Sequence, residues 1–317
     1  MTAGGVLVTG ATGFIGTHLV DRLIAGGTRP SLLVRSAPRL PSRWRGRIAV
    51  VECADWSEPG VRRALENHGF DVAFHLAAYG VNPANRDTEE MLRLNAVLPT
   101  VVVRLCRERC ARMVMTGSFS EYRRPLGQER LTEQAPLESI KIYGASKAAG
   151  GLLARSLAED LGVKLRILRL FKVYGAGEAP HRLLAALVSG LTAGRRVPLS
   201  PGMQVLDFVY VNDVVEACLR ADADMTSPIR PLTATWNVCT GVGHSVRTFA
   251  SIVAQVLGAS ADLLGFGEIA NRPDDEPWLV GSGELMRSEI GWHPGYDLAT
   301  GVRAAVASMT AAVSSFA

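Results

Sequence analysis

The sequence predicts an α/β fold in which a doubly wound parallel sheet is joined to a smaller, interleaved C-terminal lobe. Short apolar runs alternate with helical patterns over residues 6–170, as is typical of parallel sheets. A glycine-rich stretch, Gly10 to Gly16, stands between the first apolar run and the first helical pattern. Beyond Gly175 the alternation breaks, which places the second lobe in the C-terminal part of the chain.

The composition is that of a globular protein, with 317 residues, 48% of them apolar and 20% charged. The net charge of +4 is small and the arginines are dispersed, so nucleic acid is not an expected partner. No signal peptide and no apolar run of about 18 residues is found, so we expect no membrane contact and a cytoplasmic location. The five cysteines form no close pair of the zinc type, and no metal site is expected.

Strands are expected in the first part of the chain at residues 6–9, 31–34, 48–52, 72–76, 113–116 and 163–170, with helices at 61–67 and 89–109 and from Tyr143 to about residue 161. Further on we expect helices at 182–191, 213–223, 246–257, 284–290 and 298–313, and strands at 205–211 and 236–238. Residues 1–174, with 205–240 returning to them, are expected to form the cofactor domain. Residues 175–204 and 241–317 are expected to form the substrate lobe.

The glycine loop predicts a dinucleotide site in a Rossmann sheet. Its glycines permit a tight turn and close approach of backbone to a pyrophosphate, and the following helix N-terminus offers N–H donors and a positive dipole end. The residues expected to contact the cofactor there are Gly10, Thr12, Gly13, Phe14, Ile15 and Gly16.

The end of the second expected strand bears on the choice of cofactor. Arg35 stands where an acidic residue would hold the ribose hydroxyls of NAD. Arg35 and Ser36 instead offer positive charge and hydrogen-bond donors to a 2′-phosphate, which predicts NADP(H).

Tyr143 and Lys147 are four residues apart on an expected helix and therefore share one face. An ammonium beside a phenol favours the ionised form and makes the phenol a usable proton donor near neutral pH. Ser118 follows the strand expected at 113–116, at the sheet edge where the sites of open parallel sheets form. Ser118 is therefore expected at the same edge of the sheet as a binding site.

The motifs together resemble the extended short-chain dehydrogenase/reductase family, the group of nucleotide-sugar epimerases, dehydratases and reductases. They run in the family's order over nearly the whole chain: GATGFIG at Gly10, HLAA at His75, LNAVLPT at Leu94, TGSFSEY at Thr116, YGASK at Tyr143, RLFKVYG at Arg169, LDFVYVNDVVEA at Leu206, WNVCTG at Trp236, and RPDDE to GWHP from Arg272.

The resemblance implies roles for further residues. Ser118, Tyr143 and Lys147 match the catalytic triad, and Lys147 would also bond the nicotinamide ribose. The remaining cofactor contacts would come from Asp55 and Trp56 at the adenine, from Leu76, Ala77 and Ala78 beside the dinucleotide, and from Asn95 in a water and helix-positioning network. Arg272 matches an arginine that reaches a substrate diphosphate.

The sequence departs from the family pattern at two substrate positions. Leu206 stands where a second diphosphate-binding arginine is usual, and Lys172 replaces the asparagine of RLFN. Lys172 and Arg182 are candidates to restore the missing charge. Ser120 occupies the position at which dehydratases carry a general acid, which disfavours dehydration.

The function expected from these residues is NADPH-dependent reduction of the keto group of a nucleotide-linked 4-keto-6-deoxyhexose. Three alternatives stay open: a nucleotide-sugar 4-epimerase, a ketoreductase acting on a non-sugar carbonyl, and a non-catalytic NADP-binding sensor. We also expect a homodimer formed through the helix at 89–109 and the helix that carries Tyr143.

Overall fold

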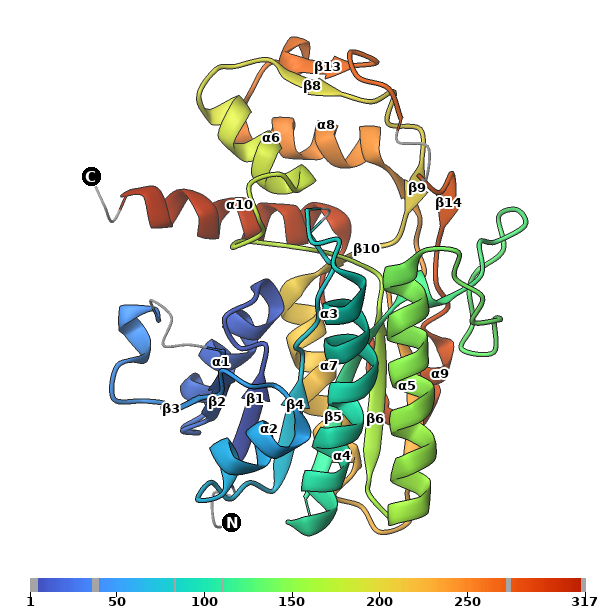
Figure 1. The fold of residues 1–317 in the computed structure, drawn as a ribbon. Helices are drawn as coiled ribbons and strands as arrows, with labels where there is room; N and C mark the ends of the chain where they lie inside the picture. The colour runs from blue at the N-terminus through green and yellow to red at the C-terminus, as the bar shows by residue number, and fades with distance from the viewer. Residues whose placement is uncertain (1–4, 36–39, 83, 110, 272–274, 315–317) are drawn as a thin grey trace. The chain divides into compact units, whose positions relative to one another are not determined.

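The computed structural model describes residues 5–35, 40–82, 84–109, 111–271 and 275–314. The chain divides into two compact units (Figure 1). The first comprises Met1–Arg123, Ala135–Leu170 and Val215–Trp236, and the second comprises Arg124–Gln134, Phe171–Val214 and Asn237–Ala317. The division into a cofactor domain and a substrate lobe stays a prediction, because it concerns which ligand each part binds.

The first unit is built on a seven-stranded sheet, which confirms the predicted fold class. Its strands are β1 (Val6–Thr9), β2 (Ser31–Val34), β3 (Ala49–Glu52), β4 (Val72–His75), β5 (Arg112–Ser118), β6 (Leu165–Leu170) and β11 (Thr233–Val238), in the spatial order β11-β6-β5-β4-β1-β2-β3. The pairs from β3 through β6 are parallel. The strand order reverses between β1 and β4, so a crevice is expected at the carboxyl ends of these strands.

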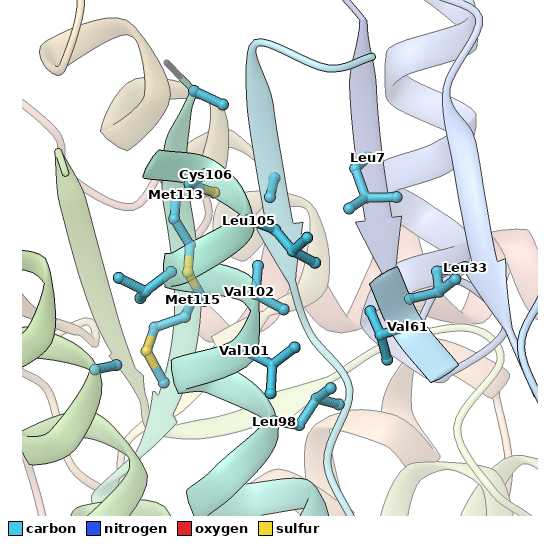
Figure 2. Close-up of a cluster of buried hydrophobic side chains, with 14 of the residues drawn as sticks. Leu7, Leu33, Val61, Leu98, Val101, Val102, Leu105, Cys106, Met113 and Met115 are labelled. Carbon is cyan, nitrogen blue, oxygen red and sulfur yellow. The ribbon is translucent and has the colours of Figure 1, made fainter. Parts of the chain in front are cut away.

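Helices cover both faces of this sheet because the strands are apolar on both sides. On one face α2 (Glu58–Leu65), α4 (Leu98–Glu108) and α5 (Ile142–Leu161) enclose the main apolar cluster. Figure 2 shows Val101, Val102 and Leu105 of α4 directed toward the strands that carry Leu7 and Met113. On the other face lie α1 (Phe14–Ala25) and α7 (Val211–Asp224), which are joined by an Arg22–Glu216 ion pair.

The helix predicted at 89–109 is interrupted. It consists of α3 (Thr88–Leu92), a π-helical turn η2 (Arg93–Val97) and α4. A π turn holds one residue more than an α turn and commonly marks a functional position. Asn95 lies within it. The strand predicted at 113–116 is longer and includes Gly117 and Ser118.

The second unit contains three small sheets. β7 (Lys172–Tyr174) pairs with β10 (Phe208–Tyr210), β8 (Val197–Leu199) with β13 (Leu264–Phe266), and β9 (Val205–Leu206) with β12 (His244–Ser245) and β14 (Trp278–Leu279). Its own helices are α6 (Leu183–Thr192), α8 (Val246–Leu257), α9 (Glu284–Ile290) and α10 (Leu298–Ser314), with Tyr174, Phe208 and Phe249 packed together.

The strand predicted at 205–211 is split at Asp207. This side chain is fully buried, and its carboxylate accepts hydrogen bonds from the backbone N–H groups of Thr240, Gly241 and Gly281 at 2.8, 2.9 and 3.3 Å. The backbone N–H of Asp207 bonds Leu279 O of β14 and its carbonyl oxygen accepts from the N–H of Lys172 of β7, so the chain changes its pairing partner at this residue. None of the helices in the described ranges combines the length and apolar character needed to cross a membrane.

Candidate functional site

The glycine loop at the end of β1 is packed so closely that side chains are excluded. Gly10 has φ = +69°, and a Cβ there would lie 2.6 Å from the backbone N of Ala77. A Cβ on Gly16 would collide with the carbonyl oxygen of Gly10. Thr12 and Gly13 are exposed, and Phe14 and Ile15 begin α1 with partly buried side chains. The loop thus presents bare backbone at a helix N-terminus, which fits a dinucleotide pyrophosphate.

Arg35 at the end of β2 is held by an ion pair. Its Nη2 donates to Glu90 Oε1 at 2.7 Å, and Glu90 Oε2 accepts from Arg93 Nε at 3.1 Å. The side chain of Arg35 is 56% exposed and that of Glu90 is 17% exposed. Sequence reasoning missed Glu90, because it lies 55 residues from Arg35. Ser36, the other predicted contact of a 2′-phosphate, lies outside the described residues.

Asp55 and Trp56 follow β3. The Asp55 carboxylate accepts from the backbone N–H and the hydroxyl of Ser57 at 2.9 and 2.7 Å, and these bonds lower its pKa. Asp55 is exposed, so its outer lone pairs face solvent, whereas Trp56 is buried in the core. Of the two side chains, that of Asp55 is exposed and that of Trp56 is not, and their contacts with the adenine stay a prediction.

The residues after β4 are anchored to β1. Thr9 Oγ1 accepts from the backbone N–H of Ala77 at 3.3 Å and lies 2.8 Å from His75 Nδ1. His75 is fully buried, and burial, assisted by the charge of Lys147, lowers its pKa to about 3. His75 is therefore neutral. Leu76, Ala77 and Ala78 are partly buried beside the glycine loop.

The three predicted catalytic residues come from β5 and α5. Ser118 ends β5, and its Oγ accepts from the backbone N–H of Ser120 at 3.1 Å. Tyr143 is the second residue of α5 and is partly buried. Lys147 is 2% exposed and donates from Nζ to the carbonyl oxygen of Thr116 at 2.5 Å. Burial lowers the pKa of Lys147, and the negative charge of Glu121 partly opposes this.

Two glycines bring Tyr143 to the carboxyl ends of β4 and β5. A Cβ on Gly144 would collide with the carbonyl oxygen of Ser120, so the first turn of α5 rests against the segment after β5. A Cβ on Gly80, after β4, would lie 3.3 Å from Cδ2 of Tyr143. Tyr143, Ser118 and Lys147 therefore lie at the carboxyl edge of the sheet, which also carries the glycine loop after β1.

Asn95 connects these parts through direct bonds. Its Oδ1 accepts from the backbone N–H of Tyr79 at 2.8 Å, and its Nδ2 donates to Tyr79 O at 2.8 Å and to Ser146 Oγ at 3.0 Å. Ser146 Oγ in turn donates to Tyr143 O at 2.8 Å. The predicted helix-positioning role of Asn95 has this physical basis, whereas its predicted contact with the cofactor stays a prediction.

A buried ion pair next to Ser118 was also missed by sequence reasoning. Arg169 Nε donates to Glu121 Oε2 at 2.9 Å, and Arg169 Nη1 donates to Tyr122 OH at 3.1 Å. Burial opposes the charge of Arg169, but Tyr122 and Glu121 together raise its pKa. Both residues belong to quoted motifs, TGSFSEY and RLFKVYG, and Arg169 in a strand of otherwise apolar residues was the available signal.

In the second unit, Lys172 and Arg182 share a carboxylate neighbour. Lys172 begins β7, Arg182 precedes α6, and both are partly buried. Burial raises the pKa of Glu178 to about 7, and the charges of Arg182 and Lys172 oppose the rise. Sequence reasoning missed Glu178. Arg272, the predicted diphosphate contact, lies outside the described residues.

Comparison with known proteins identifies the family. Residues 6–234 match the model of the NAD dependent epimerase/dehydratase family. The chain belongs to this family. It is accordingly an enzyme of an NAD(P)-dependent oxidoreductase group, which confirms the resemblance found in its motifs.

Within the described ranges, no group of three or more His, Cys, Asp or Glu side chains is arranged to hold a metal ion.

Relatives in this family carry out several reactions. The chain is 28% identical over 309 residues to a dTDP-6-deoxy-L-talose 4-dehydrogenase (NAD(P)(+)) of Kitasatospora kifunensis, an alignment covering 94% of this chain and 93% of the relative. It is 29% identical over 314 residues to a dTDP-glucose 4,6-dehydratase of Streptomyces griseus, covering 95% and 93%. The solved structure of MoeE5 in complex with UDP-glucuronic acid and NAD is 28% identical, with a TM-score of 0.83 and coverage of 98% and 100%.

Proposed function

We propose that this enzyme uses NADPH to reduce the keto group of a nucleotide-linked 4-keto-6-deoxyhexose to the 4-hydroxy sugar. The observation that carries the proposal is the grouping of Ser118, Tyr143 and Lys147 at the carboxyl edge of the sheet, next to the glycine loop. The bound dinucleotide would supply the hydride. The chain itself has to supply a proton, a hydrogen bond to the carbonyl and a positive charge.

Each catalytic residue has a distinct part in this reaction. The phenol of Tyr143 protonates the substrate oxygen as negative charge develops on it. Ser118 Oγ accepts a bond from the N–H of Ser120, so its own proton stays available to bond and polarise the carbonyl. Lys147 uses one N–H on Thr116 O, and its ammonium favours ionisation of the phenol and would bond the nicotinamide ribose.

The substrate class rests on relatives and on charge. A dTDP-6-deoxy-L-talose 4-dehydrogenase catalyses the same carbonyl–alcohol interconversion that we propose, in the oxidative direction by its name. Lys172 and Arg182, with Arg272, would supply positive charge to the diphosphate. Ser120 at the acid position continues to disfavour dehydration, although a dehydratase is among the relatives.

NADPH is favoured over NADH because Arg35 stands at the end of β2 and offers donors to a 2′-phosphate. Reduction with NADPH fits a cytoplasmic enzyme, since that reductant is regenerated there. The rival activity is a 4-epimerase, which needs tightly held NAD. A ketoreductase for a non-sugar carbonyl is the other alternative, and Leu206 in place of an arginine is the feature that supports it.

A homodimer is part of the proposal. Leu152 and Leu153 of α5 are 55% and 51% exposed, and Val97, just before α4, is 52% exposed, although α4 and α5 pack together. Exposed apolar side chains on two adjacent helices favour a helical interface between two copies. Gly150 of α5 does not belong to this exposed surface, because it packs within the monomer, where a Cβ would collide with Asn95 O. A monomer in size-exclusion chromatography with light scattering would contradict the dimer.

The test of the activity is NADPH oxidation with dTDP- and UDP-linked 4-keto-6-deoxyhexoses, compared with Tyr143→Phe. We expect turnover with at least one sugar, and a loss of about 10² to 10⁴ in kcat for the variant with cofactor binding retained. Calorimetry with NADPH and NADH on the wild type and on Arg35→Asp tests the cofactor. Copurified NAD with epimerisation and no net oxidation would establish the epimerase, and turnover of free ketones alone would establish the non-sugar reductase.

A further inference from the structure

The Glu121–Arg169 ion pair is buried below the catalytic edge of the sheet. The side chains of Glu121 and Arg169 are 1% and 9% exposed, and their atoms Oε2 and Nε are 2.9 Å apart. Taking two charges out of water costs several kcal/mol per ion, and an apolar pair of similar volume is often at least as stable. Stability alone is therefore a weak explanation for this pair.

The second oxygen of Glu121 is bonded to Ser118. Glu121 Oε1 accepts from the backbone N–H of Ser118 at 2.7 Å, while Ser118 Oγ accepts from the N–H of Ser120. Together these bonds cap the short turn η3 (Phe119–Glu121) in a reciprocal manner. A Cβ at Gly117 would lie 2.5 Å from Glu121 Oε1, so a glycine there admits the carboxylate. The carboxylate thus fixes the backbone that orients the Ser118 hydroxyl.

The same carboxylate lies beside the strand end that holds Lys147, because Lys147 Nζ donates to Thr116 O and the next residue, Gly117, is the one at which a Cβ would meet Glu121 Oε1. Burial lowers the pKa of Lys147, and the charge of Glu121 opposes that shift. The groups around the ammonium are His75 of β4, which is neutral, Tyr143 one turn earlier on the same helix, and Thr116 of β5, which offers a carbonyl oxygen. The negative charge that acts on Lys147 is that of Glu121, whose carboxylate is held by Arg169 of β6.

We propose that Glu121 is a positioning residue, which orients Ser118 through one carboxylate oxygen and supports the Lys147 ammonium through its charge, with Arg169 holding it in place. This inference rests on the proposed catalytic roles of Ser118, Tyr143 and Lys147. It assigns to Glu121 a function other than the proton donation of a dehydratase, for which it is one residue out of register. Glu121 acts through its neighbours and does not touch the substrate.

Two substitutions separate geometry from charge. Glu121→Asp keeps the charge but is one methylene too short to reach both Ser118 and Arg169, so we expect kcat to fall by about tenfold with little change in its pH dependence. Glu121→Gln removes the charge, so we expect the alkaline limb of the kcat/KM profile to move to lower pH. Because Glu121→Gln leaves Arg169 buried and unpaired, the double variant Glu121→Gln/Arg169→Met is measured as well.

The decisive readout is the titration of Lys147 by NMR of protein labelled with ¹³C and ¹⁵N in lysine. The chain has only four lysines, Lys141, Lys147, Lys164 and Lys172, so Lys147→Arg assigns the signal. We expect the Lys147 midpoint to move to lower pH in Glu121→Gln, and to move less far in the double variant, which also removes the positive charge of Arg169. Glu133→Gln is the matched control, because Glu133 Oε1 accepts from the backbone N–H of Asn237 at 2.8 Å in the second unit. Its substitution should leave the midpoint unchanged.

An unchanged Lys147 midpoint in both Glu121 variants that lack the charge, with folding verified by thermal unfolding and cofactor binding, would overturn the proposal. This titration needs no substrate. If the wild type reduces no nucleotide-linked ketosugar but Lys147 shifts as expected, the proposed substrate is wrong and the role of Glu121 stands. If ketosugars are reduced and the Lys147 midpoint does not shift, the proposed substrate stands and the role of Glu121 is wrong.

Discussion

Arg35 Nη2 donates to Glu90 Oε1 over 2.7 Å, so the residue expected to select the cofactor is already paired with a carboxylate from α3. Glu90 also binds Arg93, and the three side chains carry a net charge of +1. A 2′-phosphate brings about −2 charges to this cluster and must compete with Glu90 for Arg35. The preference for NADPH is therefore expected to be moderate.

Substituting Glu90→Gln should tighten NADPH binding and leave NADH binding nearly unchanged. Removing one partly buried charge near a phosphate corresponds to about 1 kcal/mol, or about fivefold in Kd. Calorimetry at low ionic strength measures this, and the gain should shrink as salt is added. Glu89→Gln, on the same helix and fully exposed, is the control for the change in net charge. If both variants bind NADPH equally more tightly, the effect of Glu90 comes from the change in net charge, and its ion pair with Arg35 does not matter.

Gly144→Ala should impair catalysis without weakening cofactor binding. The added Cβ would collide with the carbonyl oxygen of Ser120 and displace the first turn of α5, which carries Tyr143. A displacement of about 1 Å can cost 10²-fold in rate, so we expect a loss of roughly that size in kcat. Gly151→Ala on the same helix meets only Ile167 Cδ1 at 3.9 Å and should keep full activity. Equal activity of the two variants would contradict the close contact at Gly144.

Asn95→Ala should lower the free energy of unfolding by about 2 to 4 kcal/mol. Asn95 is 1% exposed, and its loss leaves the backbone N–H and C=O of Tyr79 and the hydroxyl of Ser146 without this partner. Urea unfolding measures the change. Asn67→Ala, at an exposed position in the turn after α2, should stay within about 0.5 kcal/mol of the wild type. An equally small change in the free energy of unfolding for Asn95→Ala would mean that water replaces the hydrogen bonds of Asn95 to Tyr79 and Ser146.

His75 predicts a loss of stability in acid. Its pKa is lowered from 6.5 to about 3 in the folded protein, so the unfolded chain binds the proton more tightly. Stability from this group is present above pH 6.5 and is lost as pH falls toward 3. Between pH 7 and pH 5 we expect His75 to account for a decrease of about 2 kcal/mol in the free energy of unfolding.

The variant His75→Asn isolates this contribution. It should be less stable than the wild type at pH 7, and the difference between the two should shrink by about 2 kcal/mol at pH 5. His293→Asn, at an exposed position, should leave the pH dependence unaltered. Parallel curves for wild type and His75→Asn would show that His75 is protonated in the fold.

The sequence predicted those parts of the fold and site that depend on local order. Gly10 and Gly16 are required by a turn within their own loop, and the spacing of Tyr143 and Lys147 is set by one helix. The partners of these residues could not be predicted in the same way. Glu90 meets Arg35 across 55 residues and Glu121 meets Arg169 across 48, and ion pairs between distant segments leave no periodic pattern.

Local pattern also failed where the chain changes its pairing partner or its helical geometry. The run around Asp207 reads as one strand, but it pairs with β14 before this residue and with β7 after it, and the choice of partner depends on segments far away in the sequence. The apolar spacing over residues 89–109 is that of a helix, and it does not reveal the π turn around Asn95.

That π turn places a polar side chain without disturbing the apolar face of the helix around it. The extra residue lets Asn95 reach Tyr79 and Ser146 while Val101, Val102 and Leu105 still point into the core in Figure 2. A π turn uses one residue more than an α turn for nearly the same rotation, so the flanking helical segments keep their phase. Deleting one residue from Arg93–Val97 would restore a regular helix and leave the valines of α4 in the core, but Asn95 would lose the position from which it bonds both Tyr79 and Ser146. The irregular turn therefore serves the polar network beside Tyr143, and the apolar core does not need it.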